Sequence, residues 1–211
     1  MEENEVIMIL KKVGAVITDS HFVYTSGKHG EVYINKDALY PHTSETSRVG
    51  ELFAEKFRDM DIDVVAAPAL GGIILSQWTA SHLSRLKGKE VLGVYTEKTP
   101  EKNQVFTRGY DKLVKGKKVL VIEDLTTTGG SVRKVVESVK AAGGEVVAVC
   151  VMVNRDPEKV NSEVVGGQFS ALGVLKAVAY DEATCPLCKS GVPINTDVGH
   201  GKKYLAQKKS V

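Results

Sequence analysis

The chain has 211 residues, with 28 lysines and arginines against 26 aspartates and glutamates, and a formal net charge of +2. This length fits one domain with its own hydrophobic core. The small net charge argues against a nucleic-acid or membrane partner, and no apolar run approaches the roughly 20 residues of a membrane span. The acidic start MEENEVIMIL is not typical of a signal peptide, so we expect a cytoplasmic protein.

Segments of helical and strand character alternate along the chain. Apolar residues at helical spacing predict a helix over Glu3–Val13, and further helices are expected after Ser44, over Gly72–Leu86 and from Gly130 to the glycine pair at 143–144. Buried strands are expected at DVVAAPA, VLGVYTEK, KVLVIED and EVVAVCVMVNR. This alternation predicts an α/β fold around a mostly parallel sheet flanked by helices. Beyond Arg155 the pattern weakens.

Four loops follow the predicted strands. They are Pro68–Ile73, Thr96–Gly109, Glu123–Ser131 and Asn154–Asp156. In a sheet of parallel strands, ligands bind at the carboxyl ends of the strands. We therefore expect these loops to meet along one edge.

The segment Val119–Ser131, VLVIEDLTTTGGS, carries the most specific signal. A buried strand runs into two acids, which suit sugar hydroxyls or a hydrated metal ion. A Gly-rich turn before a helix then offers backbone N–H groups to an anion. The pattern is neither a Walker A loop nor a dinucleotide fingerprint. It predicts a pocket for a ribose that carries a 5′-phosphate.

This motif resembles the 5-phosphoribosyl-1-diphosphate (PRPP) site of the type I phosphoribosyltransferases. The resemblance implies one domain over residues 1–211, with a core at about 44–155 and a small hood from about 17–40 and 156–205. It also implies Mg²⁺, bound mainly through PRPP. The implied contacts are Glu123 and Asp124 with the ribose, Thr126, Thr127, Thr128, Gly129, Gly130 and Ser131 with the 5′-phosphate, and Ala69, Leu70, Gly71 and Gly72 with the pyrophosphate.

SGKHGEVYIN resembles the N-terminal signature of the orotate phosphoribosyltransferases. By this resemblance Lys28, Tyr33, Thr128 and Arg155 bind orotate, because a planar anion needs cations and a flat apolar face. The implied reaction transfers the phosphoribosyl group from PRPP to orotate. An exposed polar hairpin turn is the other interpretation of Lys28. The rival functions are a purine phosphoribosyltransferase and a PRPP-sensing regulator of the same fold.

The loop Thr96–Gly109 carries Lys98, Lys102 and Arg108. In the orotate enzymes the corresponding loop closes over the neighbouring subunit's site in a homodimer, and the three cations would then act in catalysis together with Asp124. The sequence departs from the usual pattern here, because the loop contains no histidine. The residue that protonates pyrophosphate is therefore not identified.

Cys185 and Cys188 form a single CxxC within CPLCKSGVPIN, which resembles a segment of some bacterial and archaeal orotate phosphoribosyltransferases. One CxxC is half of a tetrahedral zinc site, to which His200 could add a ligand. We favour structural cysteines over a metal site, since there is no second pair. Cys150 is expected in a buried strand.

Overall fold

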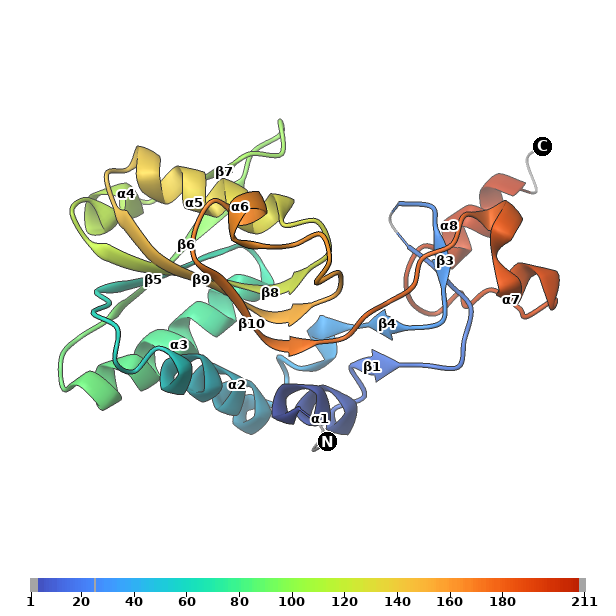
Figure 1. The fold of residues 1–211 in the computed structure, drawn as a ribbon, viewed down its shortest axis with the longest axis horizontal. Coiled ribbons are helices and arrows are strands. Elements are labelled where there is room, and N and C mark those ends of the chain that lie inside the picture. The colour runs from blue at the N-terminus through green and yellow to red at the C-terminus, as the bar shows by residue number, and fades with distance from the viewer. Residues whose placement is uncertain (1–3, 25, 209–211) are drawn as a thin grey trace.

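A six-stranded sheet lies at the centre of the larger lobe in the computed structural model, which describes residues 4–24 and 26–208 (Figure 1). The strands are β5 (Val64–Pro68), β6 (Leu92–Lys98), β7 (Gln104–Val105), β8 (Lys118–Thr126), β9 (Glu145–Asn154) and β10 (Phe169–Val174). They follow the order β10-β9-β8-β5-β6-β7, and every neighbouring pair is parallel except β6 with β7. The expected α/β fold around a mostly parallel sheet is confirmed.

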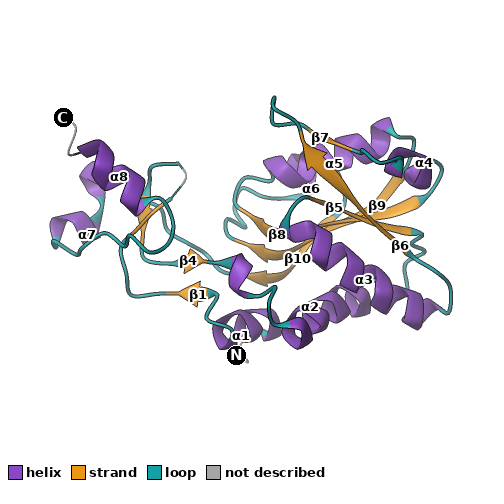
Figure 2. Ribbon diagram, turned by 180° about the vertical axis from the view of Figure 1, so that it is seen from behind, coloured by secondary structure: helices purple, strands orange, loops and turns teal. Residues whose placement is uncertain are grey.

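Helices cover both faces of this sheet, as Figures 1 and 2 show. One face carries α1 (Glu5–Lys12), α2 (Thr43–Lys56) and α3 (Gly71–Lys87), and the other carries α4 (Tyr110–Val114), α5 (Gly130–Ala141) and α6 (Ser162–Val165). The side chain of Asn4 caps α1 by accepting hydrogen bonds from the first free N–H groups of the helix. The predicted first helix is thus present, but it spans Glu5–Lys12, with Asn4 and Val13 as its caps, and Glu3 lies outside the described residues.

β8 separates two hydrophobic cores. Successive side chains of a strand point to opposite faces, so Leu120 and Ile122 pack under α2 and α3, while Val119 and Val121 pack under α5. Burial on both faces explains the unbroken apolar run that the sequence shows here. The arrowheads of β8 and β10 point toward the smaller lobe in Figure 1. The polar residues that end the strands therefore face that lobe.

The smaller lobe combines two segments that are far apart in the sequence. β1 (Val16–Ile17) pairs with β4 (Tyr33–Ile34), β2 (Phe22–Val23) pairs with β3 (His29–Gly30), and the lobe also contains η2 (Glu182–Thr184), α7 (Pro186–Lys189) and α8 (Gly201–Lys208). A short helix, η1 (Lys36–Ala38), leads from β4 back to the larger lobe. Single bridges join His21 to Ile194 and His29 to Tyr180. The segment from β1 to β4 and the segment from η2 to α8 thus meet in one small unit, here called the hood.

Two elements differ from the expectation. Residues 162–174, which the sequence assigned to the hood, instead add α6 and β10 to the larger lobe, and β10 pairs with β9. The Thr96–Gly109 loop contains β7, which pairs with the end of β6.

Within the described ranges, no helix is both long and apolar enough to cross a membrane.

Candidate active site

Two buried acids lie side by side near the carboxyl end of β8. Glu123 and Asp124 are each only 6% exposed, and their side chains reach opposite faces of the sheet. Asp124 Oδ2 accepts a hydrogen bond from the Tyr40 hydroxyl at 3.0 Å and lies 3.3 Å from Lys36 Nζ. Glu123 Oε2 accepts a hydrogen bond from the Ser131 hydroxyl at 3.0 Å. Each carboxyl group therefore has a hydrogen-bond donor beside it, and Asp124 also has a cation, at the point where β8 leaves the core.

The electrostatics of this group follow from burial and proximity. Burial and the charge of Asp124 raise the pKa of Glu123 well above its usual value, so Glu123 keeps a proton more readily than an exposed glutamate. Burial and the same charge raise the pKa of Tyr40, whose hydroxyl remains a donor. Burial alone would lower the pKa of Lys36, but Asp124 and Asp37 outweigh it and raise that pKa. The cation on Lys36 is therefore secure beside Asp124.

The turn after β8 is shaped for an anion. The Gly129 N–H donates to Thr126 Oγ1 at 3.0 Å, and Gly129 adopts a φ of +75°. A Cβ there would lie 2.8 Å from Val164, so both backbone and space require glycine. Thr127 and Thr128 are exposed at the tip, and α5 begins at Gly130. The first N–H groups of a helix have no carbonyl partner within the helix, so the start of α5 can offer donors to an anion.

The loop between β5 and α3 lies against the acids. A Cβ on Gly71 would lie 2.2 Å from Asp124 Oδ2 and 2.2 Å from the Tyr40 hydroxyl. The peptide bond between Ala69 and Leu70 is cis, and the Leu70 side chain is 81% exposed. The structure thus brings Gly71 of the predicted loop 69–72 against Asp124, one of the two predicted acids.

Arg155 lies between two neighbouring cavities. The first has a volume of about 470 Å³, and Lys28, Thr127 and Thr128 are among its lining residues. The second, of about 190 Å³, is lined by Tyr33 and Lys36 among others. Arg155 lines both, and its backbone N–H donates to the Thr126 carbonyl at 2.9 Å. The turn after β8 and Arg155 therefore lie next to each other at the same edge of the sheet.

The hood supplies the opposite wall. The Arg155 guanidinium lies 5.0 Å from the centre of the Tyr24 ring, and Tyr24 donates a hydrogen bond to the Val32 carbonyl. Lys28 Nζ lies 3.2 Å from Asp181, an exposed ion pair. The Tyr33 ring packs on Phe22 with centroids 5.4 Å apart. Lys28 and Tyr33 thus line different cavities, which meet at Arg155.

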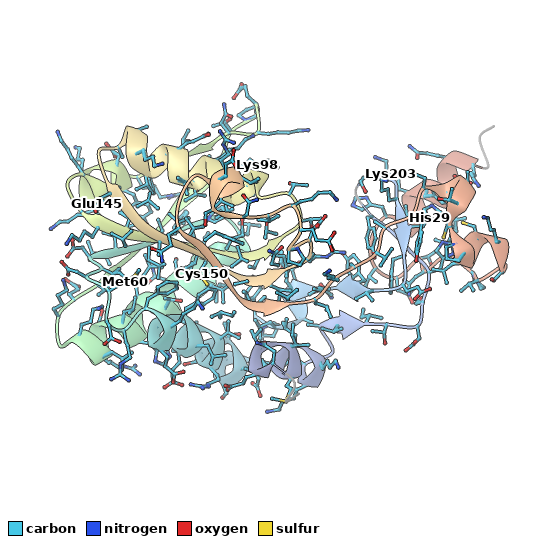
Figure 3. The ribbon with its side chains drawn as sticks, viewed as in Figure 1. His29, Met60, Lys98, Glu145, Cys150 and Lys203 are labelled. Carbon is cyan, nitrogen blue, oxygen red and sulfur yellow. The ribbon has the colours of Figure 1, made fainter. Side chains whose placement is uncertain are left out.

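The three cations of the Thr96–Gly109 loop lie apart from the site residues of the same chain. Lys98, Lys102 and Arg108 are exposed and line neither cavity. Arg108 pairs with Glu97 at 3.0 Å, which raises the pKa of the arginine through a hydrogen bond. In Figure 1 the tip before β7 projects away from the larger lobe, and Figure 3 shows Lys98 on that lobe and His29 in the hood.

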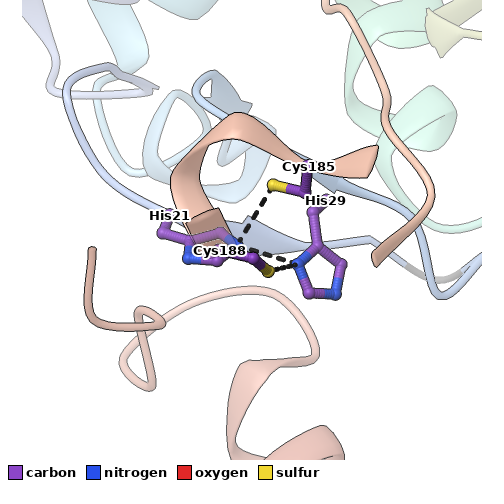
Figure 4. A group of neighbouring side chains, drawn as sticks. All are labelled: His21, His29, Cys185 and Cys188. Atoms are coloured by element: carbon purple, nitrogen blue, oxygen red, sulfur yellow. Dashed lines mark hydrogen bonds between the residues drawn. The ribbon is translucent and has the colours of Figure 1, made fainter. Parts of the chain in front are cut away.

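Cys185 and Cys188 lie in the hood beside His21 and His29 (Figure 4). His200, the histidine suggested by the sequence, is not in this group and instead lines the cavity of Tyr33. Cys150 is buried in β9, as expected.

Sequence reasoning missed three side chains at the site, namely Tyr24, Lys36 and Tyr40. Lys36 and Tyr40 lie three and seven positions after Tyr33 of the VYIN signature. A cation and an aromatic residue so close to the signature could have indicated that they belong to the site. Tyr24 lies two residues before the longer signature SGKHGEVYIN. Their contacts with Asp124 and Arg155 could not be read from spacing, because the partners come from distant strands.

Comparisons with known proteins agree with this geometry. The family model for the phosphoribosyl transferase domain matches residues 35–165. An orotate phosphoribosyltransferase of Caldanaerobacter subterraneus subsp. tengcongensis is 36% identical over 194 residues, which cover 92% of this chain and 96% of that protein. One from Thermoanaerobacter sp. (strain X514) is 38% identical over 194 residues, again 92% of this chain and 96% of the relative.

Solved structures share the fold. The orotate phosphoribosyltransferase of Mycobacterium tuberculosis H37Rv, crystallised with Fe(III) dicitrate, superposes with a TM-score of 0.66 at 23% identity, covering 82% of this chain and 95% of that one. The Aeropyrum pernix enzyme gives a TM-score of 0.60 at 26% identity, with coverages of 81% and 93%. The chain therefore belongs to the phosphoribosyltransferase family, and within it to the orotate phosphoribosyltransferases.

Proposed function

We propose that this protein transfers the 5-phosphoribosyl group of PRPP to N1 of orotate, giving orotidine 5′-monophosphate and pyrophosphate in pyrimidine nucleotide biosynthesis. The observation that carries this proposal is the position of Arg155. Its backbone N–H donates a hydrogen bond to the strand that leads into the proposed anion-binding turn, and Arg155 lines both neighbouring cavities. A cation there suits the carboxylate of an acceptor held beside the ribose.

PRPP would lie along the carboxyl edge of the sheet. Asp124 and Glu123 would accept hydrogen bonds from the ribose hydroxyls, and the turn Thr126–Ser131 would hold the 5′-phosphate. Loop 69–72 would contact the pyrophosphate. Gly71 of this loop lies against Asp124, so a ribose held by Asp124 would place its pyrophosphate near the loop. Since displacement at the ribose develops positive charge on the sugar, a carboxylate fixed by Tyr40 would stabilise it without reorganising.

Orotate would lie between the hood and the sheet edge. Lys28 and Arg155 would meet its carboxylate, and the Thr128 hydroxyl would contact it from the turn. Tyr33 would supply a flat apolar face, and Tyr24 would hold the Arg155 guanidinium in place. A purine offers no carboxylate, so two cations beside the acceptor favour the anionic pyrimidine.

Mg²⁺ belongs to this proposal as the partner of PRPP. The carboxylate oxygens of Glu123 and Asp124 are hard donors and fit such an ion, although Lys36 and Tyr40 already compensate Asp124. We therefore propose that the ion is held mainly through PRPP. When bound, it would neutralise charge on the pyrophosphate.

The loop cations would complete the site from a second subunit. Lys98, Lys102 and Arg108 are exposed and lie outside the cavities of their own chain, which is consistent with a role in a homodimer. There they would stabilise the leaving pyrophosphate and help to exclude water. None of the three cysteines is in a disulfide, which fits the reducing cytoplasm, where we propose that the enzyme works.

Pyrophosphate release from PRPP, measured separately with orotate, hypoxanthine, guanine, adenine and xanthine, tests this function. Only orotate should support turnover. An Arg155→Met variant should raise the KM for orotate about 10- to 150-fold, the cost of one lost charge-assisted hydrogen bond, with a smaller effect on PRPP. Arg58→Met, an exposed arginine at the end of α2, is the matched control. A response to purines alone, or PRPP binding without turnover, would refute the proposal.

A further inference from the structure

We propose that His21, His29, Cys185 and Cys188 bind one Zn²⁺ ion, which fastens the two chain segments of the hood together. The four potential ligand atoms all lie within 4.8 Å of one another. Figure 4 shows both thiols and both imidazoles converging on a common centre. Three of the four side chains are buried, and Cys188 is half-buried.

The spacing suits a tetrahedral site. Zn–N bonds of 2.0–2.1 Å and Zn–S bonds of about 2.3 Å require the ligand atoms to be roughly 3.3–3.8 Å apart. His21 Nε2 lies 3.7 Å from both sulfur atoms, and Cys188 Sγ lies 3.2 Å from His29 Nδ1. The two imidazole nitrogens are 2.8 Å apart. Shifts of a few tenths of an ångström in these side chains would bring the four ligand atoms to the distances that Zn²⁺ requires.

The surroundings orient one imidazole for metal binding. His21 Nδ1 lies 2.8 Å from the carbonyl oxygen of Val192, an acceptor that requires the proton on Nδ1. Nε2 then carries a lone pair directed at the centre of the group, as in metal sites where a backbone carbonyl fixes the ligand tautomer. The His29 ring packs at 84° to Tyr204, with centroids 5.1 Å apart, so its orientation is fixed as well.

The place of the group in the chain indicates a structural role. His21 directly precedes β2 and His29 begins β3, near the N-terminus, whereas Cys185 directly precedes α7 and Cys188 lies within it, more than 150 residues later. One of the two hydrophobic cores takes in Val16 and Ile34 of the hood, but neither core includes the buried Phe22, Val23 or Cys185. A unit this small gains little from burial alone, and a metal cross-link would supply the missing stability.

The donor set also selects the metal. Two thiolates and two imidazoles are soft and borderline ligands, which suit zinc and not Mg²⁺. Four protein ligands leave no open position, so the ion would not take part in phosphoribosyl transfer. The proposed reaction and this site can therefore fail independently.

Metal analysis of the full-length protein, purified without a histidine tag, tests the proposal. We expect about one zinc per chain, and a Co²⁺-loaded sample should show the visible bands and thiolate charge transfer of a tetrahedral site with two thiolates. Cys188→Ser and His21→Asn should lose the metal. Cys150→Ala, which removes a thiol outside the group, should retain it.

The wild-type protein alone suffices if these variants fail to fold. Zinc should protect Cys185 and Cys188 from alkylation, and a chelator should expose both while the hood becomes sensitive to protease. A Cys185–Cys188 disulfide in freshly purified protein, or no uptake of Zn²⁺ or Co²⁺ by the reduced wild type, would overturn the proposal. Metal retained in a folded Cys188→Ser variant would do the same.

Discussion

Gly71→Ala provides a sharp test of the site, because it adds one methyl group beside the hydrogen-bonded side chains of Asp124 and Tyr40. The new Cβ would lie 2.2 Å from Asp124 Oδ2 and from the Tyr40 hydroxyl, whereas ordinary contact begins at 3.4 Å. One of the groups must therefore move by about 1 Å, which breaks the hydrogen bond between them or displaces the carboxylate. A hydrogen bond to a charged group contributes about 1.5–3 kcal/mol, so turnover should fall about 10- to 150-fold.

Orotate-dependent pyrophosphate release gives the kcat of this variant, and thermal unfolding shows whether the fold survives. Alanine favours a helix more than glycine does, so α3 itself should not be weakened. Gly88→Ala at the other end of α3 is the control: its φ of +62° makes alanine cost about 1–2 kcal/mol of stability while kcat stays unchanged. A folded Gly71→Ala variant with the wild-type kcat would refute the proposed role of Asp124.

Three further predictions concern the acids and the loop. Asp124→Asn should cut kcat at least 100-fold in protein that remains folded, since it removes the carboxylate beside the proposed sugar cation; wild-type turnover would contradict this. Burial raises the pKa of Glu123 in the folded state, so folding stability should fall as pH rises from the usual glutamate value through the raised one. Urea unfolding should show Glu123→Gln gaining stability relative to wild type over that range, and a difference independent of pH would exclude the shift. Mixing inactive Asp124→Asn and Lys102→Ala chains should restore about a quarter of wild-type activity if the loop acts across a symmetric dimer, and no recovery on subunit exchange would place Lys102 in its own site.

The sheet and its principal loops could be predicted from the sequence because their signals are local. The apolar run before Glu123 is buried on both faces, and Gly129 permits the positive φ with which the chain turns into α5. Parallel strands then bring the loop at Gly71 to the same edge without any further signal.

The remaining features depend on contacts between distant segments. β10, FSALGV, is a half-exposed edge strand with no continuous apolar run, so the sequence suggested a boundary near residue 155 instead. The strands of the hood are two residues long and show no periodicity. The grouping of His21 with Cys185 depends on bridges between the β2–β3 region and residues 180–194, and spacing alone pointed to His200, which lies outside this group.

Identification of the nucleotide formed from PRPP and orotate by the full-length protein tests the central claim most directly. Mass analysis should find orotidine 5′-monophosphate and pyrophosphate in equal amounts, and neither should form when orotate is omitted. PRPP left intact in the presence of orotate and Mg²⁺, or consumed only when a purine base is supplied, would contradict the account.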